Sequence, residues 1–173
     1  MSQILVVDDS AIERRVLGGL LGTNPDWTVD FAGDGAEALE RCRLREPDLV
    51  LTDFNMPNMD GLQLLMKLKE NYSHVPVIIA TAEGSEELAV TALQHGAASY
   101  VPKTLMARDL KRVVDTVLSA SKDRRKTDAV QTSLIGQKLL FSFPTDRRLI
   151  GPAVNNLQDL GVRFGIFNDR ERT

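Results

Sequence analysis

The sequence has little of what builds disulfide frameworks or soft-metal sites, with one cysteine and two histidines among 173 residues. The single cysteine, Cys42, excludes an internal disulfide and any zinc site made of cysteines. Cys42 follows Leu39 by three residues within a helical pattern, so we interpret it as a small core residue. The chemistry of this chain is therefore expected to rest on oxygen and nitrogen side chains.

Long hydrophobic runs are also lacking. No stretch approaches the about 18 apolar residues that a membrane-spanning helix needs. The opening residues MSQILVVDDS carry two acids and no basic residue, which is not the pattern of a secretory signal peptide. With 43% hydrophobic and 26% charged residues, the composition is that of an ordinary soluble protein. We expect a cytoplasmic protein without a membrane partner.

The charge of the chain is unevenly distributed, although its total is only −3. Residues 1–120 hold 11 lysines and arginines against 18 acids, whereas residues 121–173 hold 10 against 6. Such asymmetry indicates two units with different roles. We therefore predict a domain over residues 1–120, a basic segment over 121–136 that is either a linker or an extension of the preceding helix, and a separate segment over 137–173.

Short apolar runs alternate with helical patterns through the first 120 residues. Apolar runs closed by turn residues are typical of strands buried on both faces, and their alternation with helices predicts a parallel sheet. The expected fold class is α/β, a five-stranded parallel sheet doubly wound by helices, with a short strand–helix appendage after it. The expected strands cover residues 4–7, 27–32, 49–53, 75–80 and 99–101. The expected helices include residues 12–21, 34–45, 61–70, 83–94 and, with the clearest amphipathic spacing, 110–118.

Polar side chains follow several of these runs, at the points where the strands leave the sheet. Right-handed crossovers bring the C-terminal ends of all the strands to one edge, where ligands bind in open α/β sheets. Taken singly, these residues have ordinary explanations, because an Asp or Thr can start a helix and a Lys is usually on the surface. Their joint occurrence at one edge favours a functional site. The residues are Asp8, Asp9, Asp53, Thr81 and Lys103.

Three carboxylates that are forced together repel each other unless a cation joins them. Oxygen ligands without cysteine or histidine nearby select a hard ion, and Mg²⁺ takes few protein oxygens while keeping its waters. A metal beside Asp53, facing Lys103 and the hydroxyl of Thr81, can hold a transferring phosphoryl group while Asp53 attacks it. The pattern therefore predicts a Mg²⁺-dependent acceptor of phosphoryl groups.

The segments ILVVDDS, DFNMPNMDG, IIATA and SYVPK resemble, in order and spacing, the receiver domain of two-component response regulators. The resemblance covers residues 3–120 and implies a flavodoxin-like fold, Mg²⁺ as cofactor, and a sensor histidine kinase or phosphotransfer protein as partner. It implies a protein that assists its own phosphorylation and dephosphorylation and is otherwise not an enzyme. The residues implied are Asp53 as phosphoacceptor, Lys103 and Thr81 as phosphate contacts, Asp8, Asp9, Asp53 and the backbone carbonyl of Asn55 as Mg²⁺ ligands, and Thr81 with Tyr100 as the switch.

One departure from the family pattern concerns the loop after the fifth strand. The family often has a proline directly after the lysine, commonly with a cis bond, whereas here Thr104 follows Lys103 and the proline is Pro102. We therefore expect a trans bond into Thr104 and do not carry over the family's loop geometry at residues 102–106.

The remainder of the chain predicts one strand over residues 139–143 and a helix that begins near Thr145. This run resembles the opening strand and first helix of the ATP-binding domain of histidine kinases and anti-sigma-factor kinases. The asparagine helix and glycine-rich loop that would bind nucleotide do not follow, so we expect no ATP binding and interpret the chain as a piece of a longer receiver–ATPase protein. The apolar faces of these elements should either pack on the chain's own receiver domain or pair with a second copy, and we favour pairing as a homodimer. The residues concerned are Phe141, Phe143, Ile150, Val154 and Leu157.

Two other functions stay open at this point. The basic residues after position 120 could contact phosphates in a DNA-binding transcriptional regulator. The sequence has no helix-turn-helix spacing, however, so we do not expect a nucleic acid partner. The chain could instead be a dimerising interaction module, joined through an elongated helix that runs past Ser121.

Overall fold

The structure, a computed structural model, describes residues 1–81 and 86–135. The predicted strand over residues 139–143, the helix after Thr145, and the pairing predicted for the apolar residues there lie outside the described residues. The first residues of the helix predicted over 83–94 lie outside them as well. Within the described part, Met1–Arg125 belong to one compact unit.

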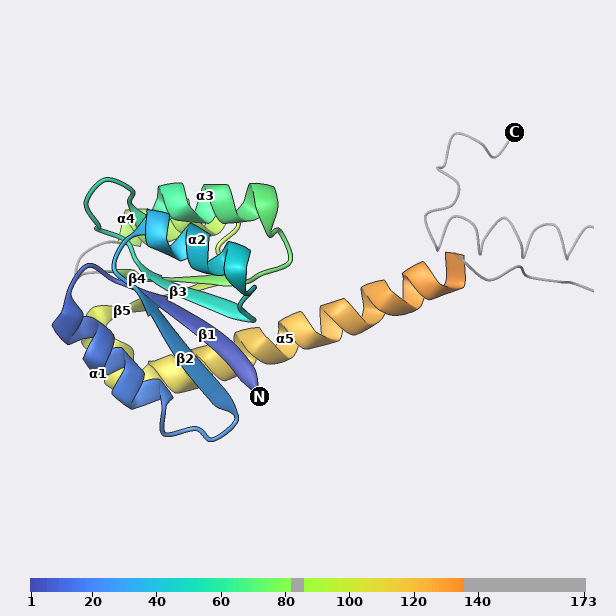
Figure 1. Ribbon diagram of the computed structural model, residues 1–173, viewed down its shortest axis with the longest axis horizontal. Coiled ribbons are helices and arrows are strands. Elements are labelled where there is room, and N and C mark those ends of the chain that lie inside the picture. Colours follow the sequence, from blue (N-terminus) through green and yellow to red (C-terminus); the bar gives the residue numbers. More distant parts are fainter. Residues whose placement is uncertain (82–85, 136–173) are drawn as a thin grey trace, which may run out of the picture. The chain divides into compact units, whose positions relative to one another are not determined.

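Five parallel strands form one sheet in the order β2-β1-β3-β4-β5 (Figure 1). This confirms the predicted five-stranded parallel sheet. Strands β1, β3 and β4 are buried along their whole length, which explains why their sequences are nearly uninterrupted apolar runs. The strands are β1 (Ser2–Val7), β2 (Trp27–Ala32), β3 (Leu49–Asp53), β4 (Val77–Thr81) and β5 (Ser99–Pro102).

The helices cover both faces of the sheet and enclose two separate cores. Helices α1 and α5 pack on one face with residues such as Leu17 and Leu110, and α2, α3 and α4 pack on the other with residues such as Cys42 and Leu65 (Figure 1). Cys42 is therefore a core residue, as predicted. The helices are α1 (Ala11–Leu21), α2 (Gly35–Leu44), α3 (Gly61–Asn71), α4 (Glu86–Gln94) and α5 (Met106–Ile135), with a 3-10 turn at Lys103–Leu105.

Three of the helices begin on side-chain caps. The side chains of Ser10, Asp34 and Asp60 each accept a hydrogen bond from the backbone N–H three residues later, at 3.3, 2.8 and 2.7 Å. Such a cap satisfies one of the N–H groups that a helix start leaves unpaired. These caps fix the points where the chain turns from loop into α1, α2 and α3.

The fourth strand begins two residues later than predicted. The N–H of Val75 donates to the carbonyl oxygen of Tyr72 at 2.9 Å, within a turn, and Pro76 has no N–H to give. The ladder therefore starts at Val77 and continues to Thr81, one residue beyond the predicted end.

In the first helix, only part of the apolar pattern faces the core. Leu17 and Leu21 are buried, whereas Ile12 and Val16 are 77% and 57% exposed. The four residues share helical spacing, but the exposed pair lies on the side of α1 that is turned away from the sheet. In the last helix the predicted face is correct: Leu110, Val114 and Leu118 are buried, and Val113 and Val117 pack beside them.

Helix α5 continues to Ile135, so residues 121–135 prolong it rather than form an irregular linker. Within residues 1–81 and 86–135, no helix combines the length and the apolar character that crossing a membrane requires.

The packing of α5 gives a stability prediction. Replacing Leu110, which is fully buried, with alanine should lower the free energy of unfolding by about 2–5 kcal/mol, because a cavity is left between α5 and the sheet. Leu44→Ala is the control, since Leu44 is 75% exposed and should change stability by less than about 0.5 kcal/mol. Urea unfolding measures both, and equal losses would contradict the packing described for α5.

Candidate functional site

The predicted site residues lie at the C-terminal edge of the sheet. Strand β1 ends directly before Asp8, and β3 ends on Asp53. Strand β4 ends on Thr81, which is paired with Pro102, the residue before Lys103. The chain order brings β1 and β3 side by side although β2 lies between them in sequence. This reversal of strand order is the position at which open α/β sheets bind ligands.

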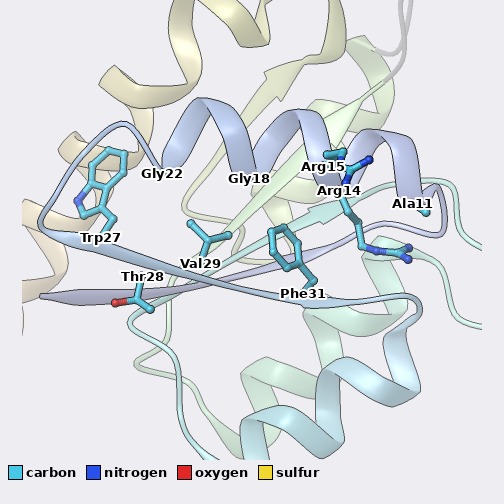
Figure 2. A pocket seen from close by; sticks show the side chains of 9 residues that line it. All are labelled: Ala11, Arg14, Arg15, Gly18, Gly22, Trp27, Thr28, Val29 and Phe31. Carbon is cyan, nitrogen blue, oxygen red and sulfur yellow. The ribbon is translucent and has the colours of Figure 1, made fainter.

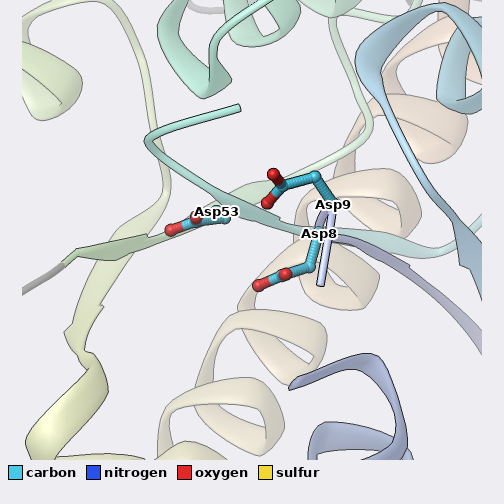
Figure 3. Close-up of side chains that lie close together, drawn as sticks. All are labelled: Asp8, Asp9 and Asp53. Carbon is cyan, nitrogen blue, oxygen red and sulfur yellow. The ribbon is translucent and has the colours of Figure 1, made fainter. Parts of the chain in front are cut away.

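Three carboxylates meet at this edge, with one oxygen from each of Asp8, Asp9 and Asp53 within 4.8 Å of the others (Figure 3). Asp8 and Asp53 are only 1% and 6% exposed, whereas Asp9 is open to solvent. Burial raises the pKa of Asp8 to about 6, although the Ser10 N–H and Lys103 oppose the shift. Burial also raises the pKa of Asp53. The ionised carboxylates therefore gain from a cation, and an all-oxygen donor set fits Mg²⁺.

The loop after β3 holds Asp53 by close backbone contacts. The N–H of Phe54 donates to Oδ1 of Asp53 at 2.9 Å. The N–H of Gly61 donates to the carbonyl oxygen of Phe54 at 2.8 Å, and a Cβ at position 61 would lie 2.2 Å from the carbonyl oxygen of Asp53. Glycine at 61 is therefore required by this close approach. Asn55 lies in the same loop and is exposed.

Lys103 places its ammonium group among the carboxylates of this edge. Its Nζ lies 3.1 Å from Oδ1 of Asp53 and 3.4 Å from Oδ2 of Asp8, and it also contacts the carboxylate of Glu13. Burial opposes the charge of Lys103, but the contacts with Glu13 and Asp53 outweigh it and raise the pKa of the lysine. Lys103 therefore stays charged and offsets part of the repulsion among the acids.

Thr81 and Tyr100 lie on the same face of the sheet. Tyr100 is paired with Ile79, two residues before Thr81, and side chains alternate faces along a strand. Thr81 is buried, whereas Tyr100 is 38% exposed. The bond from Lys103 into Thr104 is trans, as expected from the position of Pro102.

Sequence reasoning did not identify Glu13 or Arg14 as parts of this edge. Glu13 is the third residue of α1 and reaches Lys103 across 90 residues of sequence. A guanidinium N–H of Arg14 donates to the backbone carbonyl oxygen of Asp8. The Ser10-x-x-Glu13 spacing could have indicated a capping box, but that motif would have predicted a Glu13 that turns back to Ser10.

Arg14 also lines a hollow of about 600 Å³ between α1 and β2 (Figure 2). Trp27, Val29 and Phe31 of β2 form its apolar side. None of the three carboxylates lines this hollow, so it is distinct from the acidic edge.

The chain is similar to several characterised proteins. Residues 4–115 match the family described as the response regulator receiver domain. The DNA-binding transcriptional regulator NtrC of Escherichia coli is 35% identical over 139 residues, which are 78% of this chain and 29% of NtrC. A protein-glutamate methylesterase/protein-glutamine glutaminase of Pyrococcus horikoshii is 35% identical over 129 residues, which are 72% of this chain and 35% of that protein.

Solved structures agree with the sequence relatives. The crystal structure of the receiver domain of NtrX from Brucella abortus has a TM-score of 0.64 at 32% identity, covering 67% of this chain and 98% of that domain. A response regulator receiver domain protein from Clostridium thermocellum has a TM-score of 0.66 at 29% identity, covering 70% of this chain and 98% of that one.

The chain spans about a third of the length of the curated relatives it matches. The family match covers residues 4–115, which include all five strands of the sheet. The chain therefore belongs to the response regulator receiver domain family.

Proposed function

We propose that Asp53 accepts the phosphoryl group in this receiver domain, in a reaction that requires Mg²⁺. The observation that carries the proposal is the position of Asp53, almost buried at the end of β3, with Nζ of Lys103 3.1 Å from its Oδ1 and two further carboxylates beside it. Asp8, Asp9 and Asp53 would hold the Mg²⁺ together with the backbone carbonyl of Asn55. Bound there, Mg²⁺ supplies positive charge that offsets the charge of the phosphoryl oxygens.

The hydrogen bonds of Asp53 distinguish its two oxygens. Phe54 N–H and Lys103 Nζ both contact Oδ1, so we assign the attack to Oδ2. The bond from Oδ2 to phosphorus forms while the bond from phosphorus to the donor breaks, and the electron pair leaves with the donor. In a histidine kinase or phosphotransfer protein the leaving atom is a ring nitrogen of a phosphohistidine. Lys103 neutralises the transferred oxygens, and the hydroxyl of Thr81 donates to one of them.

The switch proposed for this domain couples Thr81 to Tyr100. A phosphoryl group on Asp53 adds up to about two negative charges, which draw the hydroxyl of Thr81 towards it. The shared sheet face of Thr81 and Tyr100 supports a coupling in which movement of Thr81 opens space for the tyrosine ring. Tyr100 is 38% exposed, so an inward movement would bury more of its ring.

The remaining activities of the relatives do not transfer to residues 1–120. NtrC is named as DNA-binding and the Pyrococcus protein as a methylesterase, but the matched part of each is about a third of its length. The acid excess of residues 1–120 is the opposite of what binding to nucleic acid phosphates needs. We propose that the described domain receives the phosphoryl group and that the resulting change at its interaction surface, not a second catalytic activity, is its output.

The phosphoacceptor assignment is tested by Asp53→Asn. The amide cannot act as the nucleophile, so phosphoryl uptake from acetyl phosphate should be lost while the fold persists. Incorporation of acid-labile phosphate measures uptake, and far-ultraviolet circular dichroism monitors the fold. Asp115→Asn, at an exposed position on α5, is the matched control and should take up phosphate like the unchanged protein. Wild-type levels of phosphate on Asp53→Asn would refute the assignment.

The metal site is tested through the pH dependence of stability. Because the pKa of Asp8 is raised to about 6 in the folded protein, the folded state binds more protons than the unfolded chain between about pH 4 and pH 6. Stability without metal should therefore fall as pH rises through that window. Asp8→Asn removes this carboxylate and should stabilise the metal-free protein at pH 8 by about 1–3 kcal/mol, with the advantage gone below about pH 4.

Excess Mg²⁺ should reverse this order at pH 8. The unchanged protein gains stability by binding the ion only when folded, whereas Asp8→Asn has lost a ligand. Urea unfolding with a chelator and with Mg²⁺ measures the reversal. Equal stabilisation of both proteins by Mg²⁺ would place the metal elsewhere.

The switch is tested by Thr81→Ala. This variant should still accept phosphate, more slowly, but the ring NMR signals of Tyr100 should no longer change on phosphorylation, because the hydroxyl that links the phosphate to the ring is gone. Thr116→Ala, exposed on α5, serves as the control. A full Tyr100 response in phosphorylated Thr81→Ala would show that the coupling does not pass through Thr81.

A further inference from the structure

Lys103 contacts a carboxylate that does not belong to the strand ends. Two of its partners, Asp8 and Asp53, lie at the C-terminal edge of β1 and β3. The third, Glu13, comes from the first turn of α1, where its side chain is 44% exposed. Lys103 has three N–H groups, and three separate carboxylates lie around them.

The cap of α1 explains why Glu13 is available for this contact. In α3, the complete capping box has the side chain of Gln63 accepting from the N–H of Asp60 at 3.1 Å. In α1 the corresponding N–H, that of Ser10, donates to Oδ1 of Asp8 at 2.8 Å instead. Asp8 thus takes the partner that Glu13 would otherwise have, and the carboxylate of Glu13 turns to Lys103.

A phosphoryl group on Asp53 would need the same donors of Lys103. Its oxygens would have to share or displace the contact with Glu13, and the negative charge of Glu13 would repel them. Glu13 is not among the three carboxylates that meet as a possible metal cluster, so Mg²⁺ bound there would not remove Glu13 from Lys103.

We propose that Glu13 is a positioning residue that holds Lys103 and competes with the phosphoryl group for it. This inference rests on the proposed function of Asp53 and Lys103. It predicts that Glu13 slows the phosphorylation of Asp53. It also predicts that the phosphoryl group is bound less tightly than it would be if Lys103 contacted only Asp8 and Asp53.

A purely structural role for Glu13 is distinguished by Glu37. An acid in the first turn of a helix stabilises it through the helix dipole, and Glu37 occupies the same third position in α2. Glu37 bonds to Arg41 and to the N–H of Gly33, and it has no part in the acidic edge. Glu37→Gln is therefore the matched control for Glu13→Gln. Glu13→Asp keeps the charge but shortens the side chain by one methylene, so it separates contact with Lys103 from charge alone.

The experiment uses the full 173-residue chain. The first readout is the NMR shift of the Lys103 Nζ group without metal, which should move in Glu13→Gln and Glu13→Asp but not in Glu37→Gln. The second is the affinity for beryllofluoride with Mg²⁺, a stable mimic of the phosphoryl group, together with the uptake rate from acetyl phosphate. Both should rise about two- to fivefold in the two Glu13 variants, the size that a partly exposed ion pair allows, and stay unchanged in Glu37→Gln.

The outcomes separate this inference from the proposed function. If the unchanged protein takes up phosphate at Asp53 but Glu13→Gln behaves like it, or is slower, competition by Glu13 is overturned and the proposed function stands. If Glu13→Asp matches the unchanged protein while Glu13→Gln is faster, the effect belongs to charge and the positioning role is overturned. If no variant with Asp53 takes up phosphate or binds beryllofluoride, both proposals fail.

Discussion

The chemistry of this domain depends on the balance of charges at the C-terminal edge of its sheet. Asp8 and Asp53 are buried next to each other because β1 and β3 are neighbours, and burial disfavours the ionised form of both. The ammonium of Lys103, between them, supplies one compensating charge. The charge of Lys103 does not balance those of Asp8, Asp9 and Asp53. The edge therefore favours the binding of a further cation, and that cation in turn favours the binding of a phosphoryl group. This imbalance is what makes an otherwise ordinary α/β domain a place for phosphoryl chemistry.

The fold keeps these carboxylates close together because the strands that carry them are buried. Strands β1, β3 and β4 are buried on both faces, so the residues at their ends cannot move outward to gain water without disturbing two cores. The loop after β3 is fixed by Gly61, whose missing side chain lets the backbone approach Asp53, and by Asn58, which adopts a left-handed conformation with a φ of 66°. The buried strands and this loop therefore hold Asp53 in place at the edge.

Helix α1 links this edge to the rest of the domain. Its first turn supplies Glu13 to Lys103, and Arg14 bonds to the backbone of Asp8 while also lining the hollow beside β2 (Figure 2). Asp8 in turn accepts a hydrogen bond from the N–H of Ser10, at the start of α1. Lys103 contacts both Asp53 and Glu13, so it connects the end of β3 to the first turn of α1.

The five strands and the polar residues at their ends could be predicted from patterns in the sequence. A strand buried on both faces needs an unbroken apolar run, and the polar residue that ends it must lie at an edge, so Asp8, Asp53, Thr81 and Lys103 could be placed together from local pattern alone. The predicted start of β4 is two residues too early, because the N–H of Val75 donates to the carbonyl oxygen of Tyr72 in a turn instead of joining the sheet. The exposed side of α1, with Ile12 and Val16, could not be distinguished from its buried side, because apolar spacing does not say which side meets the sheet.

The partners of Lys103, in contrast, depend on the tertiary fold. Glu13 and Lys103 are 90 residues apart, and their contact depends on the strand order, the packing of α1 and the competition between Asp8 and Glu13 for one N–H group. None of these is encoded in local periodicity. Sequence patterns indicate which residues end a strand or start a helix. The packing of the helices on the sheet then determines which charged side chains contact each other.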